Sequence, residues 1–375
     1  MNTAIFRATI LIVVSAACFS SAIVAPCLPF IAQYFDVPNS KTSLLVSIFL
    51  FGYLSGQVAY SIISQKFGYR FALILGFSIY ILSCIAQISA IQHHSFNLLF
   101  YSRFLCAFGA SSGLICVFAL INELSQCKEQ TQKLISLAFI SLTLFAYLSI
   151  TLSGLIIQYF NWIFVFYIMI LISLIQFTLI YKYIPNIKRQ HHVLKTIFSR
   201  YLHSIRNYKL LMSSLIVAFT TTSTYLYNAM ASTISTQIFL LSPSVFGMIA
   251  ILNLLALILG GCISLRCVKR YSVSNVLLSS LVLASIPIGG LLLFHEMIFS
   301  PGGNGVLFFS AVCFLNFSLG LIYPTASYFA LNAIDCSATA SSIMNFIKIA
   351  CPACIIWLVS QLQLELAARP CRHEE

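Results

Sequence analysis

Arg103 is the residue of this sequence with the clearest chemical potential, because it stands eight residues into an otherwise uncharged apolar stretch from Phe96 to Asn122. A guanidinium in such a stretch has no water to solvate it, and ionisable groups placed this way usually serve a function. Eight helical residues correspond to a depth of about 12 Å, too deep for the side chain to reach water easily. We therefore expect Arg103 to bind an anionic substrate group or to change the proton affinity of a neighbour. Bracing against backbone carbonyls is the structural alternative.

Lys348 is a second cation inside an apolar stretch, near Asn345. A desolvated lysine can lose its proton, which makes Lys348 a candidate titrating group; alternatively, its long stem reaches the membrane interface.

No acid accompanies either cation. All eight acids lie at the ends of apolar stretches, in loops or in the tail: Asp36, Glu123, Glu129, Glu296, Asp335, Glu365, Glu374 and Glu375. The sequence thus offers no membrane carboxylate to carry a proton, and strongly cationic substrates are not expected.

Other polar side chains gather in two further apolar stretches. A run of hydroxyl, aromatic and amide residues extends from Thr220 to Asn228. We expect a polar cavity lined by Thr221, Thr224, Tyr225 and Asn228, together with Asn316 and Tyr323. Because Ser and Thr bond cheaply to their own helix, a structural role is the alternative for each of them.

Catalysis, metal binding and nucleotide hydrolysis find no support in the pattern. No G-x-x-x-x-G-K-[ST] segment is present, so the chain itself is not expected to use ATP, and no cofactor is expected. The paired histidines, 93–94 and 191–192, point apart as chain neighbours, so no metal site is predicted. Most of the thirteen cysteines lie in apolar stretches and are interpreted as small hydrophobes, including the pair Cys351 and Cys354. We predict that the chain is not an enzyme.

The composition defines a polytopic membrane protein. Hydrophobic residues make up 60%, charged residues 7%, and the mean hydropathy is +0.98, whereas soluble domains carry about 25% charged residues. Breaks marked by charges, Pro, Gly or Asn predict an all-α bundle of eleven membrane spans. The first is interpreted as a retained helix, not a signal peptide. The spans cover about residues 5–33, 42–64, 71–91, 96–122, 134–158, 161–181, 210–235, 244–265, 273–299, 305–333 and 337–363.

The net charge of +12 is explained by topology rather than by nucleic-acid binding. With the N-terminus in the cytoplasm, nearly all Lys and Arg fall on the inner side, and Lys41 alone lies in an outer loop before the tail. This positive-inside asymmetry fixes the predicted orientation and adds attraction to anionic lipid.

Two halves are predicted, residues 1–181 and 210–375, joined by a basic cytoplasmic linker at 182–209. The halves repeat short patterns: Phe104–Gly109 parallels Phe314–Gly320, and Phe118–Leu120 parallels Phe329–Leu331. Such a duplication indicates pseudo-symmetric halves related about the membrane normal, with a site between them near the midplane.

Several motifs resemble those of the major facilitator superfamily. Gly52–Gln57 followed by Ser64–Arg70 is similar to its loop signature, which implies a gating loop with Gln65, Gly68 and Arg70, and Gly52 and Gly56 fit close helix packing. Arg103 with Gly109 and Gly113 resembles the superfamily's fourth-helix motif. Four further segments resemble the bicyclomycin-resistance/chloramphenicol-efflux branch of drug exporters: Pro26–Pro29, Asn161–Trp162, Pro324–Ala326 and Ala338–Ser342.

The sequence also departs from this family pattern. Gln65 stands where the loop signature carries an acid, Ser61 where glycine is usual, and Ala22 where the branch has an aspartate. The prolines usual in the fifth helix are missing from Tyr147–Gly154. Eleven spans instead of twelve indicate either that the last helix is absent, which is the favoured interpretation, or that two spans have been merged into one. An odd number of spans would place the tail outside.

The resemblance implies a secondary transporter that exports small, neutral-to-anionic, drug-like amphipathic compounds across a bacterial inner membrane by alternating access. An uncoupled facilitator or importer of a small organic anion is the first alternative, and a degenerate receptor or assembly protein is the second. The expected partners are a small-molecule substrate, protons and membrane lipid, but not nucleic acid, and the chain is expected to be a monomer.

Overall fold

The protein is all-α in the computed structural model, which describes residues 3–124, 128–185, 207–299, 304–334 and 337–368. Within these ranges there is no strand, and eleven helical segments are long and apolar enough to cross a membrane, so the predicted fold class is confirmed. The elements are α1 (Thr3–Val14), α2 (Ala16–Ala22), η1 (Ala25–Cys27), α3 (Leu28–Phe35), α4 (Asn39–Phe67), α5 (Tyr69–Gln92), α6 (Phe96–Leu124), α7 (Lys128–Tyr159), α8 (Phe164–Tyr183), α10 (Tyr208–Thr233), η2 (Ile234–Ile238), α11 (Pro243–Cys267), α12 (Val273–Leu293), α13 (His295–Phe299), α14 (Gly305–Leu331) and α15 (Ser337–Ala368).

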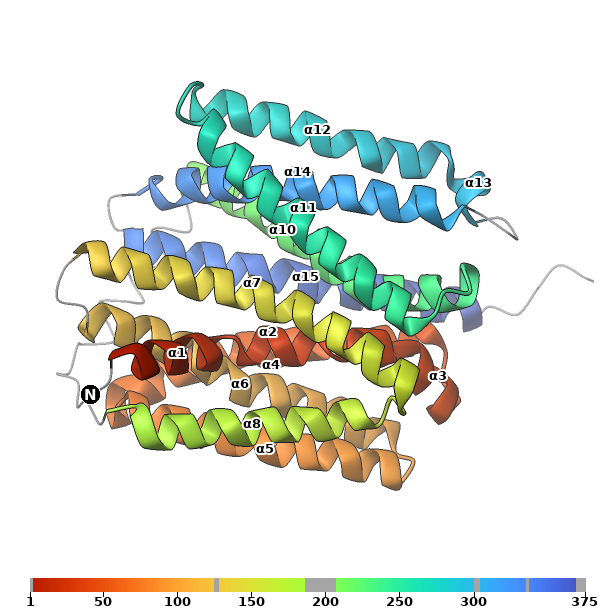
Figure 1. Cartoon of the computed structure of the whole chain (residues 1–375), viewed down its shortest axis with the longest axis horizontal. Helices are drawn as coiled ribbons and strands as arrows, with labels where there is room; N and C mark the ends of the chain where they lie inside the picture. The colour runs from red at the N-terminus through yellow and green to blue at the C-terminus, as the bar shows by residue number, and fades with distance from the viewer. Residues whose placement is uncertain (1–2, 125–127, 186–206, 300–303, 335–336, 369–375) are drawn as a thin grey trace, which may run out of the picture. The chain divides into compact units, whose positions relative to one another are not determined.

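The described chain divides into two compact units (Figure 1). Unit 1 combines Met1–His192 with Ile356–Glu375, and unit 2 comprises Val193–Ile355. The boundary falls inside α15, whereas the sequence predicts the whole of this helix in the second half. Most of the predicted linker lies outside the described residues, as do His191, His192 and the tail from Arg369 to Glu375, so the predicted domain boundaries stay a prediction.

Unit 1 is organised around α6, along which α4 and α5 pack, while α2 contacts both α6 and α7. Glycines allow the close approach. A Cβ added at Gly52 would overlap the Phe104 carbonyl, and one at Gly56 would lie 2.6 Å from the Phe108 carbonyl oxygen. Between α5 and α6, a Cβ added at Gly109 would lie 2.5 Å from the Gly76 carbonyl oxygen. Backbone-to-backbone packing of this kind is the usual basis of helix association in membranes.

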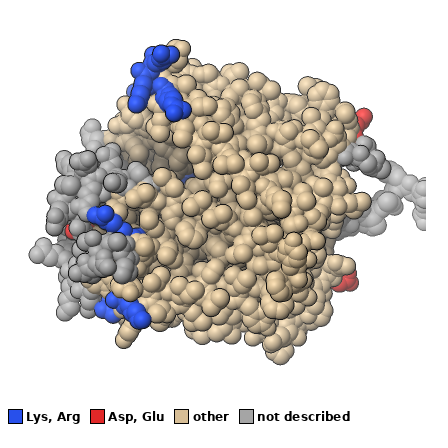
Figure 2. Space-filling view, in the orientation of Figure 1, with Lys and Arg blue, Asp and Glu red and all other residues tan. Residues whose placement is uncertain are grey.

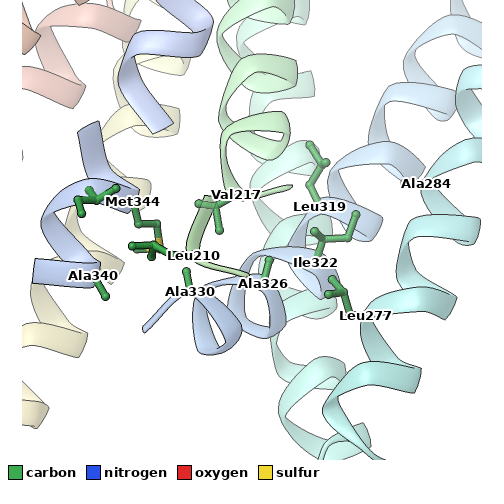
Figure 3. Close-up of a cluster of buried hydrophobic side chains, with 11 residues drawn as sticks. Leu210, Val217, Leu277, Ala284, Leu319, Ile322, Ala326, Ala330, Ala340 and Met344 are labelled. Atoms are coloured by element: carbon green, nitrogen blue, oxygen red, sulfur yellow. The ribbon is translucent and has the colours of Figure 1, made fainter. Parts of the chain in front are cut away.

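Unit 2 is organised in the same way around α14, which α10, α11 and α12 contact. Its buried apolar cluster joins α10, α12, α14 and α15 (Figure 3). The members are Leu210, Val217, Leu277, Ala284, Leu319, Ile322, Ala326, Ala330, Ala340, Ile343 and Met344.

A shared helix crossing shows that the two units repeat one design. Gly56 of α4 faces the Phe108 carbonyl of α6, and Gly260 of α11 faces the Phe317 carbonyl of α14. The two glycines stand equally far from the first residues of their own helices, and so do the two phenylalanines. This register is shifted slightly from the predicted one. In this register Arg103 of α6 corresponds to Val312 of α14, so the second unit has no buried cation at the equivalent position.

The first membrane span is broken into α1, α2, η1 and α3. Pro26 and Pro29 explain the second break, because neither can donate a backbone N–H to the preceding turn. At the first break, the Ser15 hydroxyl donates to the Ile12 carbonyl at 2.9 Å. Each break leaves helix-end carbonyls that need donors from outside the segment.

Apolar side chains cover the outside of the helices. Large hydrophobic residues are exposed on most spans, for example Val58, Leu82, Leu171, Leu252 and Val282. On the face drawn in Figure 2, most of the described surface carries no charge. Such a surface suits contact with lipid, because hydrocarbon does not solvate charges.

Candidate functional site at a buried arginine

Arg103 lies inside unit 1 with only 1% of its surface exposed. Its Nη1 donates to the Ser20 carbonyl oxygen of α2 at 3.1 Å, and its guanidinium lies over the Phe49 ring of α4 at 4.5 Å from the centroid. Within the described chain, Nε has no hydrogen-bond partner. Three helices therefore enclose one charge, and none of them supplies a carboxylate to the contacts above.

The broken first span explains why the Ser20 carbonyl can accept this bond. Helix α2 ends at Ala22, so Ser20 belongs to its last turn, where carbonyls lack intrahelical donors. A helix C-terminus also carries partial negative charge, which favours a cation beside it. The chain continues as a 3-10 turn at Pro26 instead of completing the α-helix. Thus the prolines of the first span and the arginine of the fourth act together: the break supplies the carbonyl that Arg103 binds.

The other break in the first span is bridged in the same way. The Ser141 hydroxyl of α7 donates to the Leu11 carbonyl at 2.7 Å, and the Gln176 amide of α8 donates to the Ile12 carbonyl at 2.9 Å. Helix α6 approaches the next carbonyl closely, since a Cβ at Gly113 would lie 2.5 Å from the Val13 oxygen. Irregular backbone at membrane depth is tolerated where protein groups satisfy it, and unit 1 meets that condition at both breaks.

Among the described residues, the electrostatic neighbours of Arg103 are thiols and a phenol, and none is a carboxylate. They are Cys27, Tyr80, Cys84 and Cys106. The Cys106 sulfur lies 3.1 Å from the Ser20 hydroxyl oxygen, so Ser20 contacts Arg103 through its carbonyl and Cys106 through its side chain. Gln87 is fully buried beside Cys106, and neither polar atom of its amide has a hydrogen-bond partner of good geometry among the described residues.

Lys348 belongs to unit 2 and lies in a different setting. Its Nζ donates to the Tyr323 hydroxyl at 3.3 Å and lies 5.3 Å from the centre of that ring. The nearby Asn345 amide donates to the Ser341 hydroxyl at 3.4 Å. The lysine is half-buried, and it joins α15 to α14 through a phenol, which can donate to or accept from it.

The polar residues predicted on α10 share one face, because Thr221, Thr224, Tyr225 and Asn228 follow helical spacing. Both threonines donate to their own helix, Thr221 to the Val217 carbonyl at 3.2 Å and Thr224 to the Thr220 carbonyl at 3.0 Å. Asn316 also bonds within its own helix, to Val312 at 2.9 Å, and is 6% exposed. Cavity lining by these residues stays a prediction.

The loop between α4 and α5 is held by its own neighbours in unit 1. Gly68 has φ 89 and ψ 160, a conformation that only glycine adopts readily. Arg70 donates to the Tyr181 carbonyl of α8 at 2.8 Å and lies 5.5 Å from that residue's ring. Gln65 is half-buried. The acid of this region is Glu123, which accepts a 2.7 Å bond from the buried Tyr69 hydroxyl.

Sequence reasoning identified Arg103 but missed the residues that hold it. Ser20 and Phe49 carry no spacing signal that points to α6. The one available signal was Pro26 with Pro29, since a proline-broken helix leaves carbonyls that a buried cation can bind.

An all-α bundle of apolar spans with a charge buried at a helix break is the architecture of a membrane transporter. A family model described as Major Facilitator Superfamily matches residues 10–349. The chain belongs to this superfamily, so it is a multi-pass membrane transporter, and the prediction that it is not an enzyme is confirmed.

Two curated relatives match most of the chain. An uncharacterised transporter of Rickettsia bellii is 25% identical over 346 residues, covering 89% of this chain and 84% of the relative. A bicyclomycin resistance protein homologue of Haemophilus influenzae is 22% identical over 345 residues, covering 90% and 84%.

Solved transporters share the fold. A D-xylose–proton symporter aligns with a TM-score of 0.76 at 14% identity, over 95% of this chain and 90% of that one. A bacterial homologue of the human lysosomal transporter Spinster, inward-facing and unoccupied, aligns with a TM-score of 0.72 at 12% identity, over 96% and 82%.

Proposed function

We propose that this protein exports small, neutral-to-anionic amphipathic compounds across a bacterial inner membrane. The observation that carries the proposal is the buried guanidinium of Arg103, whose direct contacts among the described residues are one carbonyl and one ring, without a carboxylate. A positive site of this kind attracts an anionic or electron-rich group and repels a cation. Similarity to a bicyclomycin resistance protein homologue supports drug-like compounds as the substrate class.

The proposed mechanism is alternating access by a monomer whose N-terminus lies in the cytoplasm. Orientation follows from the charges at the helix ends. Arg7, Lys66, Arg70 and Lys182 mark one set of ends, and Arg266, Lys269 and Arg270 continue that set, whereas Lys41 is the basic residue at the other. Positively charged ends remain on the cytoplasmic side during insertion.

An uncoupled facilitator or importer of a small organic anion is the second candidate. Arg103 and Lys348 both favour an anionic substrate, and proton coupling normally uses a membrane carboxylate.

A transporter-like receptor or assembly protein is the third candidate. The Ser20 carbonyl and Phe49 ring can hold Arg103 without any substrate, and Gln65 replaces the usual acid of the gating loop.

Proton movement in energised inside-out vesicles separates these candidates. The vesicles are challenged with chloramphenicol-like compounds and, separately, with small organic anions. We expect substrate to collapse the pH gradient in the wild-type protein and to leave it unchanged with Arg103→Ala. Arg266→Ala serves as the arginine control for loss of expression or insertion, because Arg266 is exposed at the end of α11 and has no assigned role at the site.

Each alternative gives its own pattern in these vesicles. A silent gradient combined with labelled-anion movement that ignores an uncoupler would replace the export proposal with the facilitator. Silence in both assays, with correctly inserted protein, would leave the receptor or assembly role.

A further inference from the structure

We propose that Lys348 and Tyr323 form a carboxylate-binding subsite in unit 2, with the lysine ammonium and the tyrosine hydroxyl as its two donors. The inference rests on the proposed function, because it names the chemical group by which unit 2 recognises an anionic substrate. It starts from a difference between the two cations of the spans. Arg103 is enclosed, with 1% of its surface exposed, whereas Lys348 is only half-buried and keeps part of its surface accessible.

Lys348 lies on a polar side of α15. Ser341, Asn345 and Lys348 follow one another at intervals of four and three residues, so they share one face of the helix. At 3.6 residues per turn, the exposed Phe346 stands about 200° away from Lys348 around the helix. The accessible part of the lysine therefore lies on the side of the polar residues, and not on the side of this exposed aromatic residue.

The contact between the two side chains leaves donors unused. The lysine Nζ donates to the Tyr323 hydroxyl oxygen at 3.3 Å. A protonated amine has three N–H donors and no acceptor, so the hydroxyl cannot donate back to it. The hydrogen bonds of the described residues provide no acceptor for the Tyr323 O–H or for the two other N–H bonds. One N–H donor and one O–H donor thus stand on neighbouring atoms, an arrangement that suits the two oxygens of a carboxylate.

The Tyr323 ring holds this pair of donors in place. The lysine Nζ lies 5.3 Å from the centre of the ring, a distance at which an aromatic face attracts a cation. The ring also packs against the buried apolar cluster of unit 2. Because packing fixes the ring, and the ring holds the ammonium, little side-chain freedom is lost when a ligand binds.

Charge selects the class of ligand. In the described part of the chain, the contacts of the Lys348 ammonium are the Tyr323 hydroxyl and ring, without a carboxylate. An ammonium without a counter-ion attracts an anion, and it repels a cation. A carboxylate supplies both the missing charge and the two missing acceptors, whereas a neutral amide of the same shape supplies one acceptor and no charge. The subsite therefore favours amphipathic carboxylates within the proposed range of substrates.

Calorimetric binding of benzoate to purified protein in detergent tests the subsite, with benzamide as the neutral analogue. We expect Lys348→Gln to weaken benzoate binding about a hundredfold and Tyr323→Phe about tenfold, because each removes a hydrogen bond to a charged group. Tyr328→Phe is the matched control and should bind benzoate as the wild type does, since it removes a hydroxyl from an exposed position on the same helix. The affinity for benzamide should be the same in all four proteins.

Lys348→Arg keeps the charge, so it should retain most of the benzoate affinity and provides a second test if the glutamine variant does not fold. Equal benzoate affinity in wild type, Lys348→Gln and Tyr323→Phe would overturn the subsite, and so would a parallel loss of benzamide binding, which indicates damaged packing.

The proposed export fails separately from the subsite. Unchanged benzoate affinities combined with substrate movement in vesicles would overturn the subsite and leave export intact. The expected affinities combined with vesicles that move no compound would support the subsite and contradict the proposed function.

Discussion

At the residue scale, Arg103 illustrates how costly a functional charge is in this fold. Its direct contacts are one carbonyl hydrogen bond and one aromatic ring. These contribute about 1.5–3 kcal/mol for a charged hydrogen bond and about 2 kcal/mol for a desolvated cation–π contact. Taking a guanidinium out of water costs several kcal/mol even after relaxation. The two contacts are of the same order, so they at most balance the cost of desolvation.

Replacing Arg103 with methionine tests this balance. We expect Arg103→Met to unfold at the same temperature as the wild type or higher, because an apolar side chain of similar length fills the site without desolvating a charge. Thermal unfolding of purified protein in detergent measures the effect, and the vesicle assay should show transport lost in the same variant. A marked loss of stability, above about 2 kcal/mol, would identify Arg103 as a brace for the broken helix, since an orphaned buried carbonyl has a cost of that order.

At the element scale, the spans were predictable and their internal breaks were not. Apolar length, together with breaks marked by charges, Pro, Gly or Asn, located the helices, and the predicted ends of 273–299 and 210–235 differ by a few residues from Val273–Leu293 and Tyr208–Ile238. Pro26 and Pro29 offered a signal for one break in the first span, but the span was predicted as one unbroken helix. The break at Ser15 has no proline to signal it. The carbonyls of Leu11 and Ile12 beside this break accept hydrogen bonds from Ser141 and Gln176, which come from distant helices. Partners of this kind depend on tertiary packing and cannot be obtained from local sequence.

The crossing of α11 and α14 offers a test with adjacent glycines. A Cβ at Gly260 would overlap the Phe317 carbonyl, whereas one at Gly261 would meet nothing closer than 3.8 Å. Overpacking costs about 1–3 kcal/mol, and exchanging glycine for alanine in an open helix position gains about 1 kcal/mol. We therefore expect Gly260→Ala to lower and Gly261→Ala to maintain or raise the stability in detergent unfolding. Equal effects would mean that α11 and α14 do not approach as closely as described.

At the scale of the whole molecule, composition determines the architecture while chemistry depends on a few positions. Sixty per cent hydrophobic residues leave few alternatives to a membrane bundle, and the repeated glycine crossings of the two units explain why weak sequence repeats were visible. The candidate site was only partly predictable. Arg103 stood out because it breaks the apolar pattern, but Cys106 matches that pattern, and its contact with the residue that binds Arg103, Ser20, is visible only in space.

The orientation of the whole chain is testable with alkaline phosphatase fusions, since this reporter becomes active only outside the cytoplasm. Leu240 lies between η2 and α11, and Arg270 lies between α11 and α12, so one membrane span separates them. We expect a fusion after Leu240 to be active and a fusion after Arg270 to be inactive, because the exposed basic residues Arg266, Lys269 and Arg270 favour the cytoplasmic side for their end of α11. Exchanging those three for glutamine should raise the activity of the Arg270 fusion. The reverse pattern in the two original fusions would place the N-terminus outside and make the same charges an exception to the positive-inside rule.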